Sequence, residues 1–141
     1  MSTPLHGLLI SAGQTRPVSL DPDDIAGQLT RLIDCDIFDV VHLEDGIDIF
    51  VDDEGLLVQR PVLNLALTVL AHALGTPAVL FGTGVVLSGD DETGDTLGLT
   101  GAQRQKVLDA MRQKPSTEVM NRLCESLAPF PGLVQMFRKS A

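Results

Sequence analysis

The sequence of 141 residues contains no tryptophan and no tyrosine, so phenylalanine supplies all of its aromatic side chains. Trp and Tyr are the residues most often found as interface anchors and as stacking platforms for nucleic-acid bases. Basic residues are also scarce, with 10 Lys and Arg against 19 Asp and Glu, which gives a net charge of −9. An acidic chain repels the phosphate backbone, so direct nucleic-acid binding is not expected.

Cysteines and long apolar runs are scarce as well. Cys35 and Cys124 lie far apart and match no zinc-binding spacing, so we interpret them as buried free thiols in a reducing compartment. No apolar run reaches the length of a membrane span, and the start MSTPLHGLLIS lacks a basic segment before its short apolar patch. These features predict a cytoplasmic protein without a membrane partner.

The apolar content, 44% of the chain, is enough to build the core of one domain. Charge is divided unevenly along that domain. Residues 1–99 hold 16 acids against three arginines, whereas residues 100–141 hold seven basic residues against three acids, a local balance of +4. We predict an acidic core over 1–99 and a basic helical extension over 100–141. The extension is expected to pack on the core, and contact with phosphate is the less favoured alternative.

Hydrophobic spacing predicts an α+β fold, with a small antiparallel sheet, packed helices and a C-terminal helical extension. Strands are expected at 5–11, 16–20, 36–43 and 47–51, with a third strand of a meander near 55–58. Residues 78–89, interrupted by Gly82 and Gly84, are expected to hold one bent strand or two short ones. Helices are expected at 22–34, 61–74, 100–114 and 116–127. Asp21 suits the N-cap of the first helix, and Thr100 with Gln103 has the spacing of a capping box.

Two acidic stretches each follow an apolar run. The first holds Asp52, Asp53 and Glu54, and the second holds Asp90, Asp91, Glu92 and Asp95. Neither has the ligand spacing or closing glutamate of an EF-type calcium loop, and adjacent exposed acids lack the cleft that a catalytic carboxylate needs. We interpret both as tight turns, with a weak cation site as the alternative, and expect no metal or cofactor.

The segment RPVLNLALTVLAHALGTP is the most apolar in the chain. Its polar side chains between Pro61 and Gly75 are Asn64, Thr68 and His72, spaced four apart on one helical stripe. An uncharged helix of this kind is either enclosed by its own domain or covered by a second copy of the chain. A homodimer through this helix is therefore one prediction.

Signals for an enzyme are weak. His6, His42 and His72 show no metal-ligand spacing. GTGVVLSG lacks the third glycine and the following helix of a nucleotide loop, and there is no Walker lysine. The acids beside Cys35 are expected to raise its pKa rather than activate the thiol. An enzyme or small-ligand-binding domain that uses the 82–89 strand is the third-ranked interpretation.

A resemblance rests on VVHLEDGIDIFVDDEGLL, an apolar helix-prone insert, and LFGTGVVLSGDDETGDTLGLT, in this order. Together they resemble, over roughly residues 5–110, a small bacterial and phage family described as domain of unknown function 3846. Its members show a strand, an acidic DEEG turn, then G-x-x-V-v-x-G and an acidic loop. The family's turn glycines carry over onto Gly55 and Gly89, and its turn acids onto Asp52, Asp53, Glu54, Asp90 and Asp91.

The resemblance implies a genomic context and no activity, because relatives sit on phages, plasmids and conjugative elements of bacteria. We expect a non-enzymatic accessory protein of a mobile element, in the cytoplasm of a bacterial host, that binds an unknown host or element-encoded protein in host takeover or counter-defence. One alternative is an acidic nucleic-acid mimic that occupies a DNA-binding protein. The expected interaction residues are Asp52, Asp53, Glu54, Asp90, Asp91, Glu92, Asp95, Asn64, Thr68 and His72.

Overall fold

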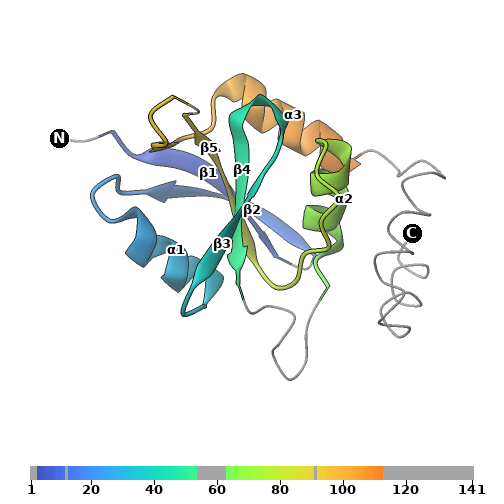
Figure 1. The fold of residues 1–141 in the computed structure, drawn as a ribbon, viewed down its shortest axis with the longest axis horizontal. Helices are drawn as coiled ribbons and strands as arrows, with labels where there is room; N and C mark the ends of the chain where they lie inside the picture. Colours follow the sequence, from blue (N-terminus) through green and yellow to red (C-terminus); the bar gives the residue numbers. More distant parts are fainter. Residues whose placement is uncertain (1–2, 12, 54–62, 91, 113–141) are drawn as a thin grey trace.

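The computed structural model describes residues 3–11, 13–53, 63–90 and 92–112. These residues form an antiparallel sheet with helices against it, which confirms the α+β prediction (Figure 1). The strands are β1 (Leu5–Ser11), β2 (Gln14–Leu20), β3 (Phe38–His42), β4 (Ile47–Asp52), β5 (Gly84–Gly89) and β6 (Thr96–Leu97). The helices are α1 (Ile25–Ile33), α2 (Leu65–Ala73) and α3 (Gly101–Arg112), with a 3-10 turn, η1 (Glu44–Gly46).

The strand order is β2-β1-β5-β4-β3, with β6 paired to β5. The hairpin of β3 and β4 was expected, but the second neighbour of β4 is β5, which inserts between β4 and β1. The meander strand predicted near 55–58 lies outside the described residues. Of the one bent strand or two short strands predicted over 78–89, the structure has the short strand β5, which begins at Gly84, preceded by an isolated bridge between Phe81 and Leu63.

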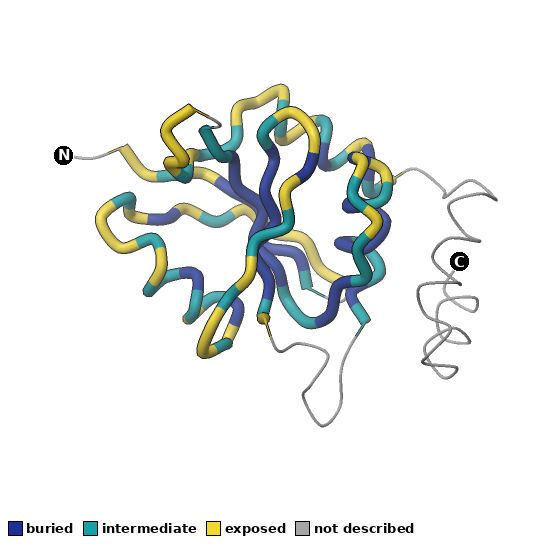
Figure 2. Tube along the Cα trace, in the orientation of Figure 1, coloured by how far each residue is buried: buried dark blue, intermediate teal, exposed yellow. Residues whose placement is uncertain are grey.

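Each face of the sheet carries its own apolar cluster, since side chains alternate along a strand. Ile47, Ile49 and Val51 of β4 point to the face covered by α2 and α3, where Leu67 and Val107 pack on them. Phe50 of β4 points to the opposite face, which α1 covers. Figure 2 shows the buried residues concentrated in the central strands between these layers. The molecule therefore has a helix layer on both sides of one sheet.

The helix starts are local structures, and one of them differs from the prediction. Asp24, not Asp21, is the N-cap of α1, because its side chain accepts a hydrogen bond from the Gly27 N–H. Asp21 closes the preceding turn by accepting from the Asp23 N–H. The capping box of α3 is confirmed, with the Gln103 N–H bonded to the Thr100 hydroxyl and the Thr100 N–H bonded to the Gln103 side chain.

Helix α3 joins the core at the start of the predicted basic extension. Its Val107 and Ala110 are buried against α2 and the sheet, while its opposite side is exposed. The helix predicted at 116–127 lies outside the described residues.

The first residue of α2 is also later than predicted, because Asn64 rather than a residue before Pro61 is the N-cap. The Asn64 side chain accepts from the Leu67 N–H at 3.1 Å, and its amide nitrogen donates to the carbonyls of Ile10 (3.0 Å) and Gly82 (2.8 Å). The Asn64 N–H donates to the carbonyl of Leu80. One buried side chain thus connects the start of α2, strand β1 and the segment that returns to β5.

Replacing Asn64 by alanine should lower the free energy of unfolding by roughly 2–4 kcal/mol. The change removes an N-cap and leaves two buried carbonyls without this donor. Asp24→Ala is the matched control, because it removes the exposed N-cap of α1 and should cost only about 1 kcal/mol. Urea denaturation followed by circular dichroism measures both. Equal losses for the two variants would contradict the anchoring role of Asn64.

Candidate protein-interaction surface

The polar stripe predicted on α2 faces the interior. Asn64 and Thr68 are completely buried. The Thr68 hydroxyl donates to the Asn64 carbonyl at 2.8 Å and accepts from the Leu80 N–H at 3.0 Å. A partner therefore has no access to either side chain in this structure. Their polarity serves to hold the 78–83 segment against α2.

His72, the third member of the stripe, is partly buried. Its Nδ1 lies 2.9 Å from the Thr68 carbonyl oxygen, so Nδ1 carries the proton and donates. Its Nε2 is buried and has no hydrogen-bond partner within the described part of the chain. The ring is thus oriented by its own helix.

The second acidic stretch forms a turn, as its composition suggested. The Asp90 carboxylate accepts from the N–H groups of Glu92 and Thr93, and the Asp90 N–H bonds to the Asp95 carbonyl. Glu92 and Asp95 are exposed, and Asp91 lies outside the described residues. Asp90 therefore shapes the turn, while Glu92 and Asp95 leave their charge in solvent.

Gly89 is not a turn glycine as the resemblance implied. It is the last residue of β5 and has no positive φ. A Cβ at this position would collide with the carboxylate of Asp48 on the neighbouring strand. A small residue is needed here to make room for the Asp48 side chain. Gly55, the other carried-over glycine, lies outside the described residues.

The first acidic stretch is joined by acids from other segments. Asp52 is the last residue of β4 and Asp53 follows it, and the Asp53 N–H bonds to the Ile37 carbonyl just before β3. This pairing places the α1–β3 connection beside the end of β4, at the lower edge of the sheet in Figure 1. The acidic end, as we name this surface, comprises Asp34, Asp36, Asp39, Asp52 and Asp53 around Ile37. Glu54 lies outside the described residues.

The acidic end has an exposed apolar centre. Ile37 is 62% exposed, the highest exposure of any large apolar side chain in the described residues. The described ion pairs are those of Arg31 with Asp24, His42 with Asp48, and Lys106 with Glu44 and Asp45. None of them includes Asp34, Asp36, Asp39 or Asp53. These four carboxylates are exposed, so their charge is presented to solvent.

The position of Asp34 is unfavourable for the stability of its helix. Asp34 is the C-cap of α1, in the left-handed conformation with φ 60°. A negative charge at the C-terminus of a helix opposes the helix dipole, where a cation would be favourable. The pKa of the Cys35 thiol is raised, first by burial and then by Asp52, Asp36 and Asp34. The carboxylates are thus close enough to act on one group, and the thiol is not activated.

The two predicted acidic stretches are not brought together. β4 and β5 are antiparallel, with Ile47 opposite Ser88 and Phe50 opposite Val85. The last residues of β4 and of β5 therefore lie at opposite ends of the sheet along the strand direction. Asp52 and Asp53 belong to one surface, whereas Glu92 and Asp95 belong to another.

A histidine and an aspartate pair across β3 and β4. His42 Nδ1 lies 2.8 Å from Asp48 Oδ1; Asp48 is buried and His42 is exposed. The pair is directly cross-strand in the sheet register. It gives the buried carboxylate a hydrogen-bond partner, which a buried charge requires.

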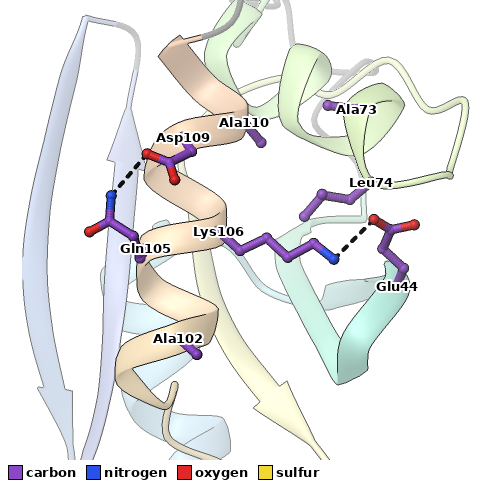
Figure 3. Close-up of a pocket in the computed structure, with 8 residues that line it drawn as sticks. All are labelled: Glu44, Ala73, Leu74, Ala102, Gln105, Lys106, Asp109 and Ala110. Atoms are coloured by element: carbon purple, nitrogen blue, oxygen red, sulfur yellow. Dashed lines mark hydrogen bonds and ion pairs between the residues drawn. The ribbon is translucent and has the colours of Figure 1, made fainter.

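A hollow of about 540 Å³ lies between α2, α3 and η1 (Figure 3). Leu74, Ala73 and Ala110 supply its apolar wall. Lys106 extends from α3 across the hollow, and its ammonium group is 3.1 Å from the Glu44 carboxylate and also contacts Asp45. The cation is thus engaged by two acids of η1. This contact fastens α3 to the β3–β4 turn.

These contacts raise the pKa of Lys106, first through the hydrogen bond to Asp45 and then through that to Glu44. A raised folded-state pKa means that the contact stabilises the fold below the ordinary lysine pKa of 10.5 and is lost as pH rises through the raised value.

Lys106→Met should lower the thermal midpoint at neutral pH and low salt. The difference from wild type should shrink in molar salt and vanish at strongly alkaline pH.

Arg104→Met is the matched control, because Arg104 is exposed on the same helix and makes no ion pair with any described residue. Scanning calorimetry at two salt concentrations makes the comparison. A loss for Lys106→Met that persists unchanged in molar salt would contradict the ion-pair account.

The described residues contain no group of three or more His, Cys, Asp or Glu side chains placed to hold a metal ion. No helix among them is long and apolar enough to cross a bilayer.

The sequence-based prediction missed Asp34, Asp36, Asp39 and Ile37 as members of a surface. The signal was present in the β3–β4 hairpin, whose register places Phe38 opposite Asp52 and Asp39 opposite Val51.

Comparison with known proteins gives a family and no activity. Neither the curated proteins nor the solved structures contain a match. The family model described as domain of unknown function (DUF3846) matches residues 5–112, which include every strand and helix described above. The resemblance drawn from the two acidic stretches is thereby confirmed. The chain belongs to the DUF3846 family.

Proposed function

We propose that this chain is a non-enzymatic accessory protein of a phage or other mobile element, and that it acts by binding another protein. The observation that carries the binding role is the acidic end. Five carboxylates, from the segment that joins α1 to β3, from β3 and from the end of β4, lie in the segments next to the exposed Ile37. An apolar centre with a charged rim is the general anatomy of a protein interface. The mobile-element context rests on the family resemblance, not on this geometry.

The placement of charge supports a binding role over a stabilising one. Like charges gathered at a helix C-terminus cost stability, so their presence needs another reason. Asp34, Asp36, Asp39 and Asp53 make no ion pair with any described residue, so they are available to a basic partner. Such complementarity raises the association rate and excludes acidic competitors. The favoured partner is a basic host or element-encoded protein.

The nucleic-acid mimic is the second candidate function. It shares the acidic surface but requires carboxylates spaced along a path that a DNA-binding protein follows. The exposed acids Glu92 and Asp95 favour it, because they lie at the opposite end of the sheet along the strands and extend the negative surface beyond a single patch. Competition distinguishes the two candidates, since DNA should displace a mimic from its partner.

The test uses the tagged full-length chain as bait in lysate of a bacterial host. Asp36→Asn with Asp53→Asn neutralises two charges of the acidic end, and Glu92→Gln with Asp95→Asn is a matched control with the same charge change. Quantitative mass spectrometry should show one or few basic proteins retained by wild type and the control, and lost with the first variant. Retention that is equal for all three baits, or no enrichment over bare resin, contradicts the proposal.

A homodimer through α2 stays a prediction, now with a narrower surface. Thr68 is buried, so a second copy would have to contact the partly exposed Leu65 and Ala66 and the exposed Ala73. Sedimentation velocity of the wild type at high micromolar concentration tests this. A single monomeric species would contradict dimerisation.

A further inference from the structure

A groove lies beside the acidic end, where the helices stop covering the sheet. Helices α2 and α3 pack over β1, β5 and β4. At the edge strand β3 the same face is bordered instead by the 78–81 segment. Asp39 and Val41 of β3 share this face, because residues two apart in a strand point the same way. A groove of about 290 Å³ results, lined by Asp39, Val41, Val51, Asp52, Asp53, Ala78, Val79, Leu80 and Phe81.

The chemistry of the groove is divided between floor and rim. Val41, Val51 and residues 78–81 give it an apolar floor. Asp39 and Asp53 are exposed at its rim, and no described residue that lines it is basic. Its volume is at the lower limit for small-molecule pockets, so it fits one or two side chains better than a whole compact ligand. The floor suits an aliphatic side chain, and the rim suits flanking cations.

The edge of β3 decides how a chain could lie there. The Asp53 N–H bonds to the Ile37 carbonyl, and the Leu43 N–H bonds to the Ile47 carbonyl. In this alternating pattern the backbone N–H and carbonyl groups of Val40 and His42 point away from β4. The Val40 N–H is bonded to the Asp39 carboxylate at 2.8 Å, and the His42 carbonyl accepts from the Thr76 hydroxyl at 2.7 Å. With these two groups engaged, an added strand could not form its full set of backbone hydrogen bonds with β3.

We infer that this groove binds an extended basic segment of a partner protein, with a leucine-like side chain on the floor and arginines against Asp39 and Asp53. The inference rests on the proposed function and specifies where and by what chemistry the partner is held. Contact is made through side chains rather than by an added strand. Charge complementarity selects this occupant, because an acidic segment would meet three carboxylates.

The experiment measures fluorescence anisotropy of a labelled heptapeptide of alternating arginine and leucine, titrated with the full-length protein. Asp39→Asn with Asp53→Asn should weaken binding about tenfold, because two exposed ion pairs are removed. Asparagine keeps an oxygen that can accept from the Val40 N–H, so the fold is retained. Glu92→Gln with Asp95→Asn, which changes the net charge equally, should alter affinity less than about twofold.

A second peptide, with serine in place of leucine, should bind the wild type about tenfold more weakly because the apolar floor is left unfilled. Cross-linking does not depend on the variants: a photoreactive group at the central leucine should label the 78–81 segment or Val41. Equal weakening by both double variants, equal affinity of the two peptides, or labelling elsewhere would each overturn the groove as the site. Partner capture from lysate that survives Asp39→Asn with Asp53→Asn would leave the proposed function standing without this groove.

Discussion

The buried amide of Asn64 is the contact on which the arrangement of the α2 side of the molecule depends. β4 and β5 are adjacent antiparallel strands, yet the chain leaves the sheet after Asp52 and returns at Gly84 with a helix between. Asn64 caps that helix and donates to Ile10 in β1 and to Gly82 just before β5. The two N–H donors and the oxygen acceptor belong to the planar carboxamide of Asn64. This one side chain therefore fixes the positions of the helix start, β1 and the 78–83 segment relative to one another.

This constraint extends to the groove. The Thr68 hydroxyl, one turn after Asn64, accepts a hydrogen bond from the Leu80 N–H and lies within hydrogen-bond distance of the Leu80 carbonyl. The Asn64 N–H donates to the same carbonyl. Among the described residues the 78–81 segment has no strand partner beyond the bridge at Phe81, so these polar contacts hold its position. The wall of the groove is therefore attached to α2 by hydrogen bonds. A preformed wall lowers the entropy cost of binding, since less must be ordered when a partner arrives.

Local patterns predicted most elements, and nonlocal contacts explain the errors. The β3–β4 hairpin and the α3 capping box depend on residues within one turn, and both were found. The spacing of Asn64 and Thr68 correctly predicted one stripe, but spacing does not state whether a stripe faces solvent or a second segment of the same chain. The insertion of β5 between β1 and β4 has no local signature. For the same reason the sequence showed two acidic turns, whereas the structure separates them and gathers acids around Ile37.

A simpler reason for acids at a sheet edge is protection against self-association, and it accounts for part of the acidic end. Asp39 lies on edge strand β3, and its carboxylate accepts a hydrogen bond from the Val40 N–H. A charged side chain on an edge strand, bonded to an outward-pointing N–H, hinders pairing with a strand of another chain. That reason does not extend to Asp34 and Asp36, which follow α1, or to Asp53, which follows β4. These three cover no free strand edge, and Asp34 acts against the dipole of its own helix. Edge protection explains one carboxylate; the charge that surrounds Ile37 is better explained by a partner that it attracts.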